Sequence, residues 1–449
     1  MDEYLCLSTT VVLTPRRAGV VDGRDNVVEV LLRVQAPDAP AGHAAQRPPQ
    51  AIALVIDRSG SMAGQPLAEA KRCAEYVISR LRPTDTLSLV QFDDRVRRLW
   101  PAQPLGDGSV QRAAVEAITE GGSTNLHGGW LDGAESLGTV AGHGLKRVIL
   151  LSDGQANQGL TDPAKIAAQC AQWASRGITT STYGLGHQFN EELMIAMARA
   201  GGGSSYYGDT AADLMEPFER ELELLGNLCL RELRLAVQAP DGVEVQVVND
   251  LPRTEGQWHL PDFAWGAEAW AVLRLKVPVT SLPPVGTAAT LVRVSVSGRT
   301  PDGEAVQLER TGLSVPVLSA GSFNALADDE LVTRRLIELA AADALTRIRA
   351  AAARGRWKEV DRMLEEASRQ FAGNEWVASV LAAMRSIAET REIERAMKEM
   401  MYSSTRLRDR LALREEGLQF SVDDEAQLPT FLRRKRMQGK SDKQSGPTA

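Results

Sequence analysis

The sequence predicts an α/β protein: a doubly wound, mostly parallel sheet that is inserted in a β-sandwich and followed by a C-terminal helical domain. Two apolar runs, Ala51–Ile56 and Val148–Leu151, have no polar residue on either face, which is typical of strands that helices cover on both sides. They belong to a series of strand and helix patterns that ends near residue 225. The period then changes to two after Asn227, and from Asp328 the composition turns to Ala, Arg, Glu and Leu.

Length and composition indicate a globular protein of several domains. At about one domain per 150 residues, a chain of 449 residues suggests three. A net charge of -7 argues against a nucleic-acid partner, and the four scattered cysteines argue against a disulfide framework or a zinc site. The sequence lacks the roughly 18 consecutive apolar residues of a membrane helix, and its start, MDEYLCLSTT, is acidic where a signal peptide is basic. We therefore expect a cytoplasmic protein without a membrane segment.

The amino end has two strand patterns, residues 3–14 and 26–36, which need partners elsewhere because a two-stranded ribbon is barely stable alone. After a Pro- and Ala-rich linker, strands alternate with helices, which indicates right-handed βαβ crossovers. The expected strands are 51–56, 86–92, 96–100, 148–151 and 178–183, and the expected helices are 65–82, 110–118, 130–137, 163–175, 190–200 and 211–225.

The second half begins with five alternating patterns: residues 228–237, 243–248, 271–277, 289–296 and 313–317. We expect residues 1–45 and 227–318 to form one β-sandwich, with an α/β domain at 50–225 inserted into it, because insertion is tolerated where termini lie close together. A helical domain should cover 326–418, and a polar tail at 421–449 should be disordered.

The helical domain is expected to contain three helices. The first carries apolar residues from Leu331 and stops at Gly355, and the second runs from Trp357 to Gly373. The third begins near Glu375 and continues through Met401, with Glu415 as its furthest end.

The strongest functional signal lies where apolar runs end in polar side chains. Asp57, Ser59 and Ser61 follow the first run, Asp153 follows a later one, and Thr124 lies in the Gly-Gly-Ser-Thr-Asn-Leu stretch between them. Carboxylates and hydroxyls, without Cys or His beside them, suit Mg²⁺, Mn²⁺ or Ca²⁺ rather than Zn²⁺. In doubly wound sheets, ligands bind at the carboxyl ends of the strands, beside the point where the strand order reverses.

These three motifs, in this order, resemble the von Willebrand factor A (VWA) family over roughly residues 50–225. The whole layout is similar to bacterial multi-domain VWA proteins and, more distantly, to inter-alpha-trypsin inhibitor heavy chains. The resemblance implies a metal-ion-dependent adhesion site (MIDAS) with the ligands Asp57, Ser59, Ser61, Thr124 and Asp153. Two questions stay open: Ser123 could supply the hydroxyl instead of Thr124, although the T-N-L-x-x-G context favours Thr124, and Arg58 either helps to hold an anionic ligand or points into solvent.

The resemblance implies a protein-binding module whose bound metal takes a carboxylate from a partner, as an adaptor or assembly subunit. We predict no enzymatic activity, because the sequence has no G-x-x-x-x-G-K-[ST], G-x-S-x-G or H-E-x-x-H motif, and we interpret His127 and His187 as capping or surface residues. Alternative interpretations are a metal that only stabilises loops, a metal-dependent hydrolase, and an accessory subunit of a separate AAA+ ATPase, which accompanies A domains in some bacteria.

Overall fold

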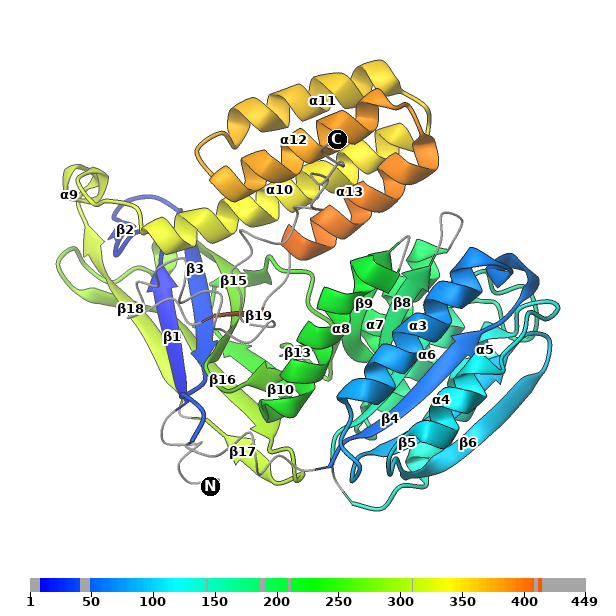
Figure 1. The fold of residues 1–449 in the computed structure, drawn as a ribbon. Helices are drawn as coiled ribbons and strands as arrows, with labels where there is room; N and C mark the ends of the chain where they lie inside the picture. Colours follow the sequence, from blue (N-terminus) through cyan, green and yellow to red (C-terminus); the bar gives the residue numbers. More distant parts are fainter. Residues whose placement is uncertain are drawn as a thin grey trace, which may run out of the picture.

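The computed structural model describes residues 9–40, 49–142, 144–185, 190–208, 211–308, 310–407 and 411–413. Within these ranges the chain forms an α/β part, a β part and a bundle of helices (Figure 1). The predicted α/β class, with its mostly parallel sheet and its C-terminal helices, is confirmed. The predicted tail at 421–449 and His187 lie outside the described residues. No helix in the described ranges is both long and apolar enough to span a membrane.

The α/β part is built on a six-stranded sheet of order β6-β5-β4-β7-β8-β9. All neighbours pair in parallel except β5 and β6, which are antiparallel. The strand order reverses at β4, so the carboxyl ends of β4 and β7 lie side by side at the switch point. The strands are β4 (Ala51–Asp57), β5 (Thr86–Phe92), β6 (Val96–Pro104), β7 (Lys146–Ser152), β8 (Ile178–Leu185) and β9 (Gly202–Gly208).

Helices cover both faces of this sheet, which explains why every residue of β4 is buried. One face packs against α3 (Gln65–Arg80), α4 (Ser109–Glu116) and α8 (Ala211–Gly226). The other packs against α5 (Leu126–Gly138), α6 (Pro163–Ala174) and α7 (Glu191–Ala200). The helices expected from the periodicity are present, whereas β9, which the sequence analysis did not predict, completes the sheet beside β8.

The β part consists of two sheets that enclose one apolar core. Its central contact is between β3, which precedes the α/β part, and β15, which follows it, because these strands pair along ten residue positions. Strands from both sides of the α/β part therefore share one core; the domain boundaries themselves stay a prediction. The first sheet contains β1 (Thr10–Pro15), β3 (Asn26–Gln35), β15 (Ala267–Val277), β11 (Glu244–Val247) and β19 (Leu411–Leu413). The second contains β2 (Val20–Val21), β10 (Leu228–Gln238), β12 (Arg253–Thr254), β13 (Gln257–His259), β14 (Phe263–Ala264), β16 (Ala288–Arg299), β17 (Ala305–Gln307) and β18 (Thr311–Leu318).

The prediction of a single helix from Glu375 through Met401 is wrong. The chain forms two helices there, with a turn at 390–392, and residues 411–413 are a strand rather than a helical extension towards Glu415. Arg391 adopts a φ of 58° in this turn, and its guanidinium donates to both carboxylate oxygens of Asp361 at 2.9 Å. The turn thus depends on a contact 30 residues away. The helices are α9 (Ala320–Asn324), α10 (Glu330–Ala352), α11 (Trp357–Gln370), α12 (Glu375–Glu389) and α13 (Ile393–Leu407).

Helix α10 connects the three parts of the structure. Its first half packs on the outer face of β3 and β15, where the Arg335 guanidinium lies 4.7 Å from the centre of the Trp270 ring. Its second half belongs to the core of the helical bundle. Near its end, Arg349 forms ion pairs with Glu191 at 3.3 Å and Glu192 at 3.1 Å, at the start of α7.

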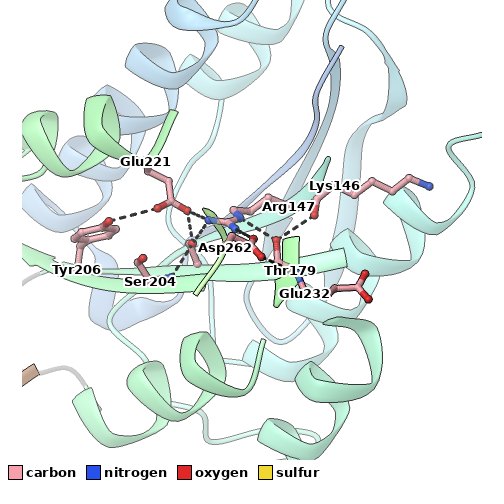
Figure 2. Close-up of polar contacts among 9 residues, drawn as sticks. Lys146, Arg147, Thr179, Ser204, Tyr206, Glu221, Glu232 and Asp262 are labelled. Carbon is pink, nitrogen blue, oxygen red and sulfur yellow. Dashed lines mark hydrogen bonds and ion pairs between the residues drawn. The ribbon is translucent and has the colours of Figure 1, made fainter. Parts of the chain in front are cut away.

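A buried polar cluster joins the α/β part to the β part (Figure 2). Arg147 of β7, with 2% of its side chain exposed, donates to Glu221 of α8, which is fully buried. Arg147 also lies 3.5 Å from Asp262, in the loop before β14, and donates to Thr179 at 2.9 Å. Burial opposes the charge of the guanidinium, but Glu221 and Asp262 outweigh it and raise the pKa of Arg147.

Candidate metal centre

The first loop of the candidate centre begins at the last residue of β4. Asp57 is fully buried, and its Oδ1 accepts a 2.8 Å hydrogen bond from the Ser59 backbone N–H. A short turn, η1 (Gly60–Met62), then brings the Ser61 Oγ to 3.2 Å from the Ser59 Oγ. Ser59 is buried and Ser61 is exposed, so this row of oxygen atoms leads from the end of the strand to the surface.

The loop after β7 adds the second carboxylate. The Ser152 hydroxyl donates to the Asp57 Oδ2 at 2.6 Å and accepts from the Gly154 N–H at 2.8 Å. The Ser61 hydroxyl favours the charged form of Asp153 and so opposes the rise in the pKa of that carboxyl. The bond between Ser152 and Asp57 joins the first loop directly to this loop after β7, the third loop of the centre. Gly154 has a φ of 70°, and a Cβ there would lie 2.9 Å from the Met194 Cγ, so both conformation and space favour glycine.

The Thr124 loop is positioned mainly through its backbone. The Gly60 N–H donates to the Gly122 carbonyl at 2.8 Å, which fixes this loop against the first one. Thr124 exchanges hydrogen bonds with Asn157 of the third loop: its N–H donates to the Asn157 Oδ1 at 2.7 Å, and its carbonyl accepts the Asn157 N–H at 3.2 Å. Thr124 is buried whereas Ser123 is exposed, which favours Thr124 as the hydroxyl that faces the other loops.

The two carboxylates lie close enough to influence each other. Burial is the main reason why the pKa of Asp57 rises to about 6, and the charge of Asp153 adds to the effect against hydrogen bonds from Ser152 and Ser59. Burial also raises the pKa of Asp153. Two buried acids with hydroxyls beside them suit a hard divalent cation, which would relieve their repulsion. Because the described ranges contain no group of three or more His, Cys, Asp or Glu side chains that could hold a metal, such an ion would depend on the hydroxyls.

Arg58 fits neither of the two interpretations made from the sequence. Its side chain donates from Nη2 to the Asp93 Oδ2 at 2.5 Å and from Nη1 to the Thr119 carbonyl at 3.0 Å, and it is 22% exposed. The His127 side chain also has a polar partner, because its Nε2 lies 2.9 Å from the Gln169 Oε1.

Comparison with known proteins identifies the α/β part. The family model described as "von Willebrand factor type A domain" matches residues 51–220. This part of the chain is a VWA domain. The resemblance inferred from the three motifs is therefore confirmed. It includes the likeness to inter-alpha-trypsin inhibitor heavy chains: heavy chain H1 of Mesocricetus auratus is 29% identical over 170 residues, which are 35% of this chain and 18% of the heavy chain.

Two bacterial relatives align with part of this chain. The protein sll0103 of Synechocystis is 26% identical over 207 residues, 46% of this chain and 49% of the relative. YfbK of Escherichia coli is 28% identical over 180 residues, 39% of this chain and 31% of the relative. The chain thus spans about half or less of the length of these curated relatives.

Two solved structures share the fold beyond the VWA domain. A von Willebrand factor type A protein from Catenulispora acidiphila has a TM-score of 0.63 at 18% identity and covers 86% of this chain and 89% of its own. The ArnB paralog VWA2 from Sulfolobus acidocaldarius has a TM-score of 0.56 at 17% identity, with 88% and 99% covered. At these identities the likeness shows the fold alone: a VWA domain together with the β part and the helices.

The sequence analysis missed three residues that shape the centre. Ser152, next to Asp153, bonds to Asp57, and its position before the aspartate was a usable signal. Asn157 and Asp93 had no such signal, because their contacts with Thr124 and Arg58 span 33 and 35 residues.

Proposed function

We propose that this protein is a divalent-metal-dependent protein-binding module, an adaptor or assembly subunit rather than an enzyme. In this proposal Asp57, Ser59, Ser61, Thr124 and Asp153 hold a Mg²⁺-like ion, for which Mn²⁺ and Ca²⁺ are substitutes, and the ion binds a carboxylate of a protein partner. The observation that carries the proposal is the juxtaposition, at the switch point of the sheet, of two buried carboxylates at the ends of neighbouring strands, with the Ser59 and Ser61 hydroxyls beside them and Ser152 bonded to Asp57.

The donor set explains why a partner carboxylate would be attracted. Mg²⁺ takes about six oxygen ligands, so five protein oxygens leave room for at least one more. Hydroxyls are neutral, and an ion held by two carboxylates attracts a further Asp or Glu more strongly than one surrounded by acids. The exposure of Ser61 supports an open side at the surface, and Arg58, the cation within the motif, is paired with Asp93.

The first test is a metal-dependent shift in thermal stability. An ion at about a hundred times its dissociation constant adds about 2.7 kcal/mol to folded-state stability, which is readily measured as a rise in melting temperature. Asp57→Asn should abolish the shift. The matched control is Asp162→Asn, which also removes one carboxylate but retains a good helix N-cap for α6, and it should leave the shift intact.

The second test concerns the partner. Proteins captured with Mg²⁺ and released by a chelator should no longer be captured by Asp57→Asn. Thr124→Ala should weaken capture more than folding, if Thr124 coordinates the ion mainly in the ligand-bound state, as the family resemblance implies. If Asp57→Asn still captured the same partner with unchanged affinity in excess EDTA, the adhesion-site proposal would be wrong.

Two alternatives remain predictions from the sequence. A metal-dependent hydrolase would release phosphate from common phosphoesters when Mg²⁺ is added, and Asp57→Asn would lose that activity. An accessory subunit of an AAA+ ATPase would retain the ATPase in the capture experiment. Neither outcome is favoured by a particular contact in the described part of the chain.

A further inference from the structure

We propose that Arg58 and Asp93 are positioning residues of the metal centre. Their ion pair holds residues 119–125, which carry Thr124, against the loop that carries Asp57, Ser59 and Ser61. The proposal rests on the proposed function, because it states how the chain arranges that same site before an ion binds.

Arg58 links three backbone segments. Its side chain bonds to Asp93, in the turn between β5 and β6, and to the Thr119 carbonyl. Its own backbone continues the link, since its N–H donates to the Phe92 carbonyl at 2.9 Å and its carbonyl accepts the Gly121 N–H at 2.7 Å. One residue inside the Asp-x-Ser-x-Ser motif therefore contacts the neighbouring loop segment at two positions near its start, Thr119 and Gly121.

Asp93 completes the arrangement from the other side. Its Oδ2 accepts from Arg58 and from the Gly122 N–H at 3.3 Å, its Oδ1 accepts from the Arg95 N–H at 2.8 Å, and its carbonyl accepts the Asn125 N–H at 2.8 Å. Thr124 thus lies between two residues that Asp93 holds. The carboxylate is 4% exposed, so these bonds are shielded from water.

The close approach of the glycine loop fits this role. A Cβ at Gly121 would lie 2.0 Å from the Asp93 Oδ2, nearer than any real contact, so the carboxylate occupies the space that a side chain would fill. The Asp93 carboxylate therefore packs directly against the backbone of Gly121, and removing it would allow the backbone of residues 119–125 to move. Changes in residues that orient metal ligands typically reduce metal affinity by about 10- to 100-fold.

A purely electrostatic effect of the pair predicts a different pattern. Removing the positive charge of Arg58 would leave Asp93 uncompensated near the ion and tighten metal binding, whereas removing the charge of Asp93 would weaken it. A positioning role predicts weaker binding for both changes, because either one releases the loop. The direction of the Arg58 effect separates the two explanations.

The experiment titrates Mn²⁺ alone into the full chain by calorimetry, for the unmodified protein, Arg58→Ala, Arg58→Lys and Asp93→Asn. The control pair is Arg98 and Asp132 on β6 and α5, which are joined at 2.8 Å, are 34% and 26% exposed and lie outside the three loops. Arg98→Ala and Asp132→Asn should leave the Mn²⁺ dissociation constant unchanged. Melting in EDTA confirms that each variant is folded.

We expect Arg58→Ala and Asp93→Asn each to raise the Mn²⁺ dissociation constant about 10-fold or more. Arg58→Lys should lie between them and the unmodified protein, because an ammonium retains the charge but lacks the planar fork that reaches Asp93 and Thr119 together. Tighter binding by Arg58→Ala, or unchanged constants with only a lower melting temperature, would overturn the positioning role and leave the proposed function intact. Absence of Mn²⁺ binding to the unmodified protein would overturn both.

Discussion

Replacing Arg147 by Met should lower the free energy of unfolding by about 3–5 kcal/mol, the usual cost of breaking a buried ion pair by removing one partner. The methionine roughly fills the volume of the aliphatic stem, so the loss comes from the charge that is left behind. Glu221 is fully buried, and after the change it would keep only a 2.6 Å bond from the Ser181 hydroxyl and a 3.4 Å bond from the Tyr206 hydroxyl. Two neutral donors do not compensate a buried carboxylate.

The double variant Arg147→Met with Glu221→Leu measures the coupling energy between the two side chains. Replacing both partners by apolar residues removes the unpaired charge of Glu221 and leaves only Asp262, which is 16% exposed. The double variant should therefore be more stable than Arg147→Met alone, and the two single changes should be strongly non-additive. Arg98→Met is the surface control: its pair with Asp132 is 34% and 26% exposed, so its loss should be at most about 1 kcal/mol.

The measurement is urea-induced unfolding in EDTA, followed by far-UV circular dichroism and by melting temperature. A loss below about 1 kcal/mol for Arg147→Met, or additive effects in the double variant, would refute the view that a buried charge pair fastens α8 to the sheet.

Two further predictions concern protonation and the β part. Because the pKa of Asp57 is about 6 without metal, a proton competes with the ion, and apparent Mn²⁺ affinity should fall about tenfold per pH unit below that value in calorimetric titrations. In the metal-free protein the same raised pKa makes the folded state more stable at low pH. This contribution of Asp57 to the free energy of unfolding should be lost as pH rises from about 4 to about 6, and melting in EDTA would show the loss. Deleting residues 1–35 should remove the cooperative melting of the chain, because β15 loses its ten-position pairing with β3; a deletion protein that melts as sharply as the full chain would contradict the shared core.

Most of the fold could be predicted because local pattern and global structure agree. The run before Asp57 is buried on both faces, as its lack of polar residues indicated. Gly202–Gly208 was not recognised as a strand because its glycines, serines and tyrosines show no apolar alternation, and only pairing with β8 makes it one. The turn between α12 and α13 was not predicted for a similar reason: helix-forming residues surround it, and Arg391 is held by the distant Asp361.

The candidate site divides in the same way. Four of the candidate ligands could be predicted because they follow apolar strands, and the sheet brings them together: Asp57, Ser59, Ser61 and Asp153. The partner of Arg58 could not be predicted, because a 35-residue separation between Arg58 and Asp93 leaves no periodic signal. Contacts between loops depend on backbone paths that a single sequence does not encode locally.

The two connections of the VWA domain to the β part have a mechanical consequence. The chain enters at Ala51, whose N–H donates to the Leu145 carbonyl, and leaves through Leu225, which packs on that same leucine before β7. Both attachments therefore lie at the amino edge of the sheet, a strand length of roughly 23 Å from the candidate metal centre at its carboxyl edge. If the proposed function holds, a pulling force from a partner on the metal would run lengthwise along β4, which parallel neighbours flank on both sides, and would divide between two tethers. Rupture would then require shearing two hydrogen-bond ladders at once rather than unzipping one end, a geometry that suits a connector working under tension.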